Sequence, residues 1–498
     1  MAALVLAVAT MAGCAKDEIS NVNVDGEVFT ITVKMPGDAK ALTERGVKTF
    51  AVDDQIKVTY DGGKTAISEP LAEGNISNDG KSASFTFTLS SPTLAEGSAI
   101  KYEYPAAHEG LSGQDGTLAT LASTYDYAVC NTTVAEAGKL PSNVNLTNAY
   151  AILKLNLKNS DGSEDITSGV RQLTVTLGGQ TVTVNRTPAA GPVYVAVPAA
   201  SGTIVFYAAK GKDLYTKSVV NQTITAGHLY PVNLSMSIVE GALSGLFSVS
   251  ASKKVYFSKG NLMAVFIGSS NPIYTSPTWK FADNQWGCVG DAAANNAITG
   301  TGTVSTAGAV DLFGWSATNY NTYGIDSSTY GQHYRGDFRD WGTNAISNGG
   351  NTANLWSTMS DTEWDYLKSH ATWGMATVAG VCGLIILPDN YSGTAITSGH
   401  GSGWNTNIID ASSWASGYEA YGAVFLPAAG YRTRTTMLYD PSSDHDSDKR
   451  GYYWSSRSYE YGGNYGGHYV LFDITGFSSE YDSKGHVGKS VRLVRVAN

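Results

Sequence analysis

The residues best suited by type and spacing to do chemistry are three acids near the end of the chain. Asp444, Asp446 and Asp448 alternate with His445 and Ser447. Alternating carboxylates can place oxygen ligands around a calcium ion in a loop. An EF-hand would also need a glycine and a closing glutamate in register, and the sequence has neither here. A solvated acidic loop is therefore the favoured interpretation, and a calcium site is the weaker one.

Other catalytic patterns are missing from the sequence. It contains neither a Gly-x-Ser-x-Gly nucleophile elbow nor a His/Glu zincin spacing, and no particular pair of carboxylates is indicated for glycoside cleavage. Cys130, Cys288 and Cys382 are far apart, which argues against zinc and favours small buried hydrophobes. The scattered histidines, including His468 and His486, are expected on surface loops. We therefore expect no catalytic residues, no cofactor and no enzyme activity.

The start of the chain carries a different kind of chemistry. A short apolar run ends in Ala12, Gly13 and Cys14, and is too short to span a bilayer. It resembles a bacterial lipobox, which implies cleavage before Cys14 and a diacylglycerol on its thiol, with residues 1–14 as the signal peptide. No Lys or Arg precedes the run, so we expect a truncated start. The alternative is a buried N-terminal strand.

Composition restricts the class of protein. Lys+Arg 33 against Asp+Glu 43 gives a net charge of −10, which argues against a nucleic-acid partner. A chain of 498 residues is too long for a single hydrophobic core, so two to four domains are expected. Gly 55, Tyr 29 and Trp 10 with 15% charged residues suit turn-rich β structure with aromatic surfaces, as in extracellular binding proteins.

The elements predicted around these residues are mostly strands. Before residue 240, β-prone segments alternate with turns, as in antiparallel sandwiches, and examples are residues 28–34, 56–60, 151–157 and 193–197. The stretch 237–245 is the favoured join to the following region. One short helix is predicted near residues 360–369, with Ser360 or Asp361 as N-cap and Trp364 and Leu367 on one face.

The N-terminal half resembles the fimbrillin family of Bacteroides-type bacteria. Three segments carry the resemblance in the right order: KYEYPA at 101–106, AYAILKL at 149–155 and TAGHLYPVNL at 225–234. It implies a mainly β fold with two transthyretin-like antiparallel β-sandwich domains, at residues 15–148 and 149–240. Fimbrillins lose their first strand to an arginine-specific protease and accept a donor strand from the next subunit. Arg45 is the expected cleavage site, and an ordinary loop arginine is the alternative.

The C-terminal half resembles Fibrobacter-type major paralogous proteins, which are related to the formylglycine-generating-enzyme and C-type-lectin-like fold. The segments that carry this resemblance include VYFSKGNL at 255–262, GLIILPD at 383–389, AVFLPAAGYR at 423–432 and GYYWSS at 451–456. It implies an α+β domain over residues 246–498. The relatives' copper chemistry uses cysteines near the C-terminus, and here no cysteine follows Trp454. Trp286, Trp315, Trp364 and Trp454 are expected in the core.

Ligand binding is expected on loops rich in Tyr, Gly and Asn, because such side chains form adaptable binding surfaces. The candidate residues are Tyr320, Tyr323, Tyr330, Tyr334, Tyr459, Tyr461 and Tyr465. We interpret the chain as a lipid-anchored outer-membrane surface protein acting as a fimbrial tip or accessory adhesin. Its expected partners are other fimbrial subunits, joined by strand exchange, and a surface glycan or protein. The alternative is a non-fimbrial glycan-binding lipoprotein that serves nutrient capture.

Overall fold

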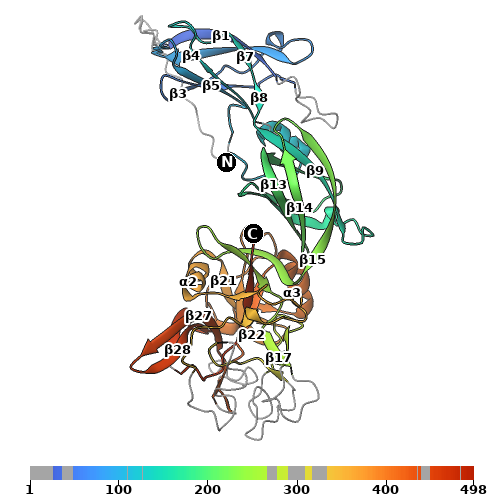
Figure 1. Cartoon of the computed structure of the whole chain (residues 1–498), viewed down its shortest axis with the longest axis vertical. Coiled ribbons are helices and arrows are strands. Elements are labelled where there is room, and N and C mark those ends of the chain that lie inside the picture. Colours follow the sequence, from blue (N-terminus) through green and yellow to red (C-terminus); the bar gives the residue numbers. More distant parts are fainter. Residues whose placement is uncertain are drawn as a thin grey trace, which may run out of the picture. The chain divides into compact units, whose positions relative to one another are not determined.

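The computed structural model describes residues 26–35, 49–108, 110–125, 127–265, 277–289, 309–316, 334–433, 436–438, 449–482 and 484–497. Within these ranges the chain is built mainly from strands, as predicted (Figure 1). It divides into two compact units. Among the described residues, the first holds 26–35, 49–108 and 127–148, and the second holds 110–125 and those from 149 onward. No helix in the described ranges is long and apolar enough to cross a bilayer.

The first unit is a β-sandwich. Its strands are β1 (Gly26–Lys34), β2 (Lys57–Tyr60), β3 (Lys64–Ile67), β4 (Ser82–Ser90), β5 (Ala99–Tyr104), β6 (Ala128–Thr133), β7 (Asn143–Asn145) and β8 (Thr147–Asn148). They form two sheets, in the orders β4-β1-β7 and β3-β2-β5-β6-β8. Alternate side chains of both sheets, such as Phe85 and Phe87 of β4 and Val58 and Tyr102 opposite, share one core.

The second unit begins with another sandwich. Its elements are α1 (Leu118–Thr120), β9 (Tyr150–Asn159), β10 (Val170–Leu177), β11 (Gln180–Asn185), β12 (Val193–Pro198), β13 (Ala200–Lys210), β14 (Asp213–Ile224) and β15 (Leu229–Ser248). β9 pairs antiparallel with β12 and parallel with β15. The alternating Leu153, Leu155 and Leu157 of β9 lie in a core with Val175 and Phe206. The prediction of these strands is therefore confirmed, because the apolar residues that alternate in the sequence are the buried ones.

β15 continues without a break through residues 237–245. Its first part pairs with β9, its middle with β14 and its last part with β16. Leu214 and Val239 of the sandwich share a hydrophobic cluster with Trp279, Trp341 and Trp454 of the following region. The second sandwich and the C-terminal region are therefore joined by backbone hydrogen bonds and by a common core.

The C-terminal region mixes short strands with helices. Its elements are β16 (Lys254–Ser258), β17 (Leu262–Val265), β18 (Thr278–Phe281), β19 (Ala309–Val310), β20 (Ser357–Thr358), α2 (Asp361–His370), β21 (Trp373–Val378), β22 (Val381–Ile386), β23 (Ile408–Ile409), α3 (Ala411–Gly417), β24 (Val424–Pro427), β25 (Tyr431–Thr433), β26 (Thr436–Leu438), β27 (Gly451–Tyr461), β28 (Asn464–Asp473), β29 (Gly476–Asp482) and β30 (Leu493–Val496). β30 pairs with β16, so the last strand of this region lies beside its first strand. Its assignment as a C-type-lectin-like fold stays a prediction.

The predicted helix is confirmed as α2. Ser360 is its N-cap, and Ser360 and Glu363 form a reciprocal capping box. Trp364 and Leu367 are buried on one face, as predicted. Trp315 and Trp454 also lie in the core, whereas Trp286 is only half-buried.

Three histidines differ from the expectation of a surface loop. His370 is the last residue of α2, and the other two are His468 and His486. His486 is 4% exposed. His468 lies on β28, and its Nδ1 is 3.4 Å from the Oδ2 of Asp361. Neighbouring residue types suggested loops for His468 and His486, but long-range packing in this Trp-rich region covers them.

Candidate functional site

β1 is the central strand of its sheet, with one edge paired along its whole length and the other paired over three residues. Its nine residues pair antiparallel with β4, and residues 32–34 pair in parallel with β7. Ile31, Val33 and Met35 point into the core and are 2%, 0% and 6% exposed. Without β1, the facing edges of β4 and β7 would lose their partners and the core would lose a row of apolar side chains.

Two predicted processing residues lie outside the described ranges. They are Cys14, the expected lipidation site, and Arg45, the expected cleavage site. In the sequence, Arg45 comes after β1 and before β2. A cut at Arg45 would therefore separate β1 from every other strand without breaking the rest of the chain.

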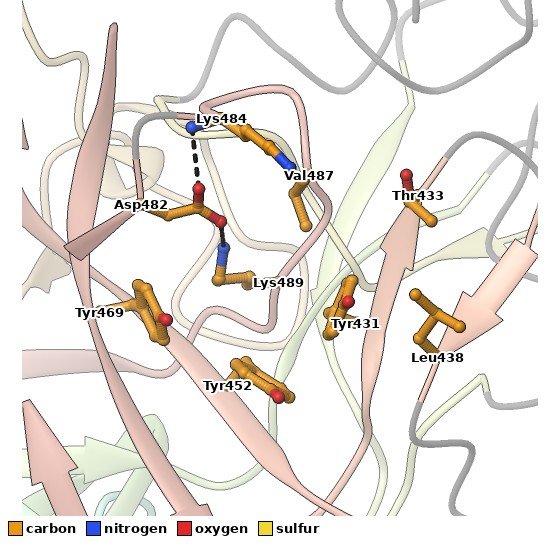
Figure 2. A pocket seen from close by; sticks show the side chains of 9 residues that line it. All are labelled: Tyr431, Thr433, Leu438, Tyr452, Tyr469, Asp482, Lys484, Val487 and Lys489. Carbon is orange, nitrogen blue, oxygen red and sulfur yellow. Dashed lines mark hydrogen bonds and ion pairs between the residues drawn. The ribbon is translucent and has the colours of Figure 1, made fainter. Parts of the chain in front are cut away.

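A cavity of about 370 Å³ lies in the C-terminal region beside β25, β27 and β28 (Figure 2). Its lining residues are Tyr431, Thr433, Leu438, Tyr452, Tyr469, Asp482, Lys484, Val487 and Lys489. Figure 2 shows the three tyrosines along one side and the Asp482–Lys489 pair on another. Aromatic rings and polar groups thus converge on one space, as in sites for small polar ligands.

The tyrosines pack against one another. The Tyr431 and Tyr452 ring centroids are 5.0 Å apart at 81°, and those of Tyr452 and Tyr469 are 5.8 Å apart at 42°. Tyr469 also meets Trp454 edge-on at 6.0 Å. Such contacts hold rings in place at little entropic cost, since each has only two side-chain torsions.

Lys489 is a buried cation on the cavity wall. Its Nζ lies 2.7 Å from the Oδ2 of Asp482, 4.1 Å from the Trp454 ring centroid and 4.4 Å from that of Tyr469. Burial lowers the pKa of the Lys489 ammonium to about 8, although Asp482 acts to keep it charged. The backbone N–H of Lys484 donates to the other Asp482 oxygen at 2.8 Å, so this carboxylate is fixed in place.

The predicted binding tyrosines do not come together in this cavity. Tyr320, Tyr323 and Tyr330 lie outside the described residues, as does the side chain of Tyr461. Tyr334 donates to the Asp337 carbonyl at 2.9 Å and packs against the core.

Tyr459 and Tyr465 have other neighbours. Tyr459 stacks on Tyr481, with ring centroids 4.4 Å apart at 20°. The guanidinium of Arg335 lies 5.2 Å from the Tyr465 ring centroid. The cavity could not be predicted from the sequence, because its three tyrosines come from three separate strands. Tyr469 is the only one of them that lies within the two Tyr-rich stretches, 320–334 and 459–469, from which the predicted binding tyrosines come.

The calcium candidates Asp444, Asp446 and Asp448 also lie outside the described residues. In the part of the chain that the structure describes, no three His, Cys, Asp or Glu side chains are grouped so as to hold a metal ion.

Comparisons with known proteins give distant structural likenesses. No family model matches the chain, and no curated protein matches it. A structure from Bacteroides ovatus, described as a candidate cell adhesion protein, is 16% identical and covers 43% of this chain and 95% of its own, with a TM-score of 0.25. One from Bacteroides uniformis with the same description is 15% identical over 42% and 97%, with a TM-score of 0.25.

A tip fimbrial protein from Porphyromonas gingivalis, solved with a C-terminal truncation, is also similar. It is 8% identical and covers 42% of this chain and 95% of its own, with a TM-score of 0.23. TM-scores of this size establish neither a shared fold nor a shared function.

Proposed function

We propose that the protein is a surface adhesin subunit of the fimbrial type. Its first sandwich assembles with other subunits by strand exchange, and its C-terminal region binds a surface glycan or protein. The observation that carries this proposal is the position of β1, which is central in its sheet and precedes Arg45 in the sequence.

Strand exchange needs an incoming segment that repeats what β1 provides. Such a segment must offer backbone groups to β4 and β7, and it must alternate so that apolar side chains enter at the positions of Ile31 and Val33. Backbone hydrogen bonds supply affinity in this mode of binding, and the alternating side chains supply specificity.

The cavity of Figure 2 is the proposed ligand site. The apolar C–H faces of a sugar can stack on Tyr431 and Tyr469, while Asp482 and Thr433 offer polar partners to hydroxyl groups. The C-terminal region binds this ligand and does not catalyse its breakdown. Robust hydrolysis of polysaccharide by the full chain would contradict that part of the proposal.

A lipid on Cys14 places the newly exported subunit on the outer membrane. Two acyl chains bury enough methylene groups for stable attachment, which one chain does not. Cleavage at Arg45 then releases both the lipid and β1, since both precede the cut in the sequence.

The test is to replace Arg45 with Ala and to measure the intact mass of the protein recovered from the cell surface. The unaltered protein should be recovered from filaments with a mass that begins at Gly46, and Arg45→Ala should retain the N-terminal segment and stay out of filaments. Lys40→Ala is the matched control and should mature normally. An unaltered mature N-terminus in Arg45→Ala, with normal filament incorporation, would contradict the proposal.

The non-fimbrial alternative has support from one observation. The Tyr-lined cavity belongs to the second unit and needs no contribution from β1. Gold-labelled antibody against the C-terminal region separates the two functions on intact cells. Label at filament ends supports the adhesin, whereas label over the membrane without filaments supports nutrient capture.

A further inference from the structure

A second cavity, of about 340 Å³, lies where the second sandwich meets the C-terminal region, within one compact unit. Two arginines line it, at the start of β10 and just after β11. The lining residues that matter here are Arg171, Gln172, Asn185, Arg186, Asn390 and Ser392.

Arg171 is a cation that bonds only to uncharged oxygens. Its Nε donates to the Ala420 carbonyl at 3.1 Å, and its Nη2 donates to the Ser244 hydroxyl at 2.5 Å and to the Gly211 carbonyl at 3.5 Å. Its Nη1 donates to no residue in the described ranges. Burial lowers the pKa of Arg171 to about 10, opposed by nearby tyrosines. This guanidinium has lost much of its hydration without gaining a counter-charge.

Arg186 is a second cation whose hydrogen bonds in the described ranges go only to uncharged oxygens. Its Nη1 and Nη2 donate to the carbonyls of Thr167 and Ala189 at 3.4 and 2.9 Å. Burial also lowers the pKa of Arg186, and Asp115 opposes that shift from a distance. Among the described residues, no carboxylate lies within 4.0 Å of either guanidinium. Lys489 differs in this respect, because it has Asp482.

The remaining lining is suited to hydroxyl groups. Gln172 donates to the Oδ1 of Asn185 at 2.8 Å, which leaves the Nδ2 of the exposed Asn185 as a donor. Asn390 and Ser392 approach from the C-terminal region. A carboxylate alone would fill only part of such a space.

We propose that this cavity binds an acidic sugar, with the sugar carboxylate held by Arg171 and Arg186. The Nη1 of Arg171 and the free donors of Arg186 meet the carboxylate oxygens, and the amides and the Ser392 hydroxyl meet the ring hydroxyls. Hydrogen bonds between a guanidinium and a carboxylate are about twice as strong as neutral ones. This site is separate from the Tyr-lined cavity and does not depend on strand exchange.

The test is calorimetric titration of the full chain with methyl glucuronide, methyl glucoside and inorganic sulfate. Methyl glucuronide should bind about tenfold or more tightly than methyl glucoside, which carries a hydroxymethyl group in place of the carboxylate. Arg186→Gln should weaken glucuronide binding about tenfold or more. The matched control is Arg339→Gln, an exposed arginine outside the cavity, which should bind as the unaltered chain does.

Asn185→Asp is a second variant that adds a negative charge at an exposed position, so it tests the site without removing Arg186. It should also weaken glucuronide binding without lowering the unfolding temperature. Equal binding of glucuronide and glucoside, no glucuronide binding, or unaltered binding by both variants would overturn the proposal. Sulfate binding as tight as that of glucuronide would overturn the assignment to a sugar.

Discussion

The two sandwiches are built from the same alternating pattern but differ in how the chain connects them to the rest. In the first sandwich, the strand that fills the centre of one sheet is β1, the first strand that the structure describes. In the second, the last strand, β15, continues into the C-terminal region and pairs there with β16. A strand on the N-terminal side of a single cut, such as one at Arg45, can be removed and replaced while the rest of the chain stays intact. β15 cannot be removed in this way, because it joins two cores. The first sandwich is therefore suited to strand exchange, and the second is suited to holding the C-terminal region.

The largest expected effect is at Ile31, because β1 contributes it to the first core. Ile31→Ala should lower the free energy of unfolding of the first sandwich by about 3–4 kcal/mol, through lost burial and the cavity left behind. Hydrogen exchange followed by mass spectrometry should show faster exchange in β4 and no change in β14. Val28→Ala, at a residue 67% exposed on the same strand, is the control and should change little. Equal loss of protection in both sandwiches would remove the distinction between them.

A slightly smaller effect is expected at Gly245, where β15 passes between the second sandwich and the C-terminal region. An added Cβ would lie 2.1 Å from the carbonyl oxygen of Gly422. Gly245→Ala should therefore destabilise the second unit by about 3 kcal/mol and leave the first sandwich unchanged. Thermal unfolding measures this, with Gly74→Ala as the control because no atom lies within 4 Å of its added Cβ. A normal unfolding temperature would show that the junction is looser than these contacts imply.

The smallest effect concerns acid stability, and it is confined to the first sandwich. Burial acts to raise the pKa of Glu103, but Lys101, Tyr127 and Lys57 outweigh it and lower this pKa from 4.5 to about 2. The folded state therefore holds the proton less tightly than the unfolded state. The stabilisation is complete above pH 4.5 and is lost as the pH falls towards 2.

The difference in unfolding free energy between the unaltered chain and Glu103→Gln should accordingly shrink by about 1–2 kcal/mol between pH 5 and pH 2.5, since water screens part of the interaction. Denaturant unfolding at the two pH values measures it. Glu136→Gln removes the exposed ion pair with Lys139 and should show no such change. A constant difference for Glu103→Gln would contradict the assigned pKa.

Local patterns predicted the regular elements well. Strand β9 was predicted because its alternate leucines must enter a sandwich core, and α2 because Ser360 can cap a helix whose Trp364 and Leu367 share a face. These features depend on neighbours within a few residues.

The sites depend on residues that are distant in the sequence. Tyr431, Tyr452 and Lys489 meet only after three separate segments have folded. Arg171 and Arg186 were not singled out from the sequence, because the lack of carboxylate partners becomes visible only once their surroundings are known.

The central claim is that the first sandwich accepts a strand in place of β1. The direct measurement uses the chain from Gly46 to Asn498, mixed with a synthetic peptide of residues 26–35, and follows hydrogen exchange in β4. We predict that the peptide slows exchange in Ser82–Ser90, and that the same peptide carrying Val33→Asp does not. Full protection of β4 without any peptide, or equal protection by both peptides, would contradict strand exchange.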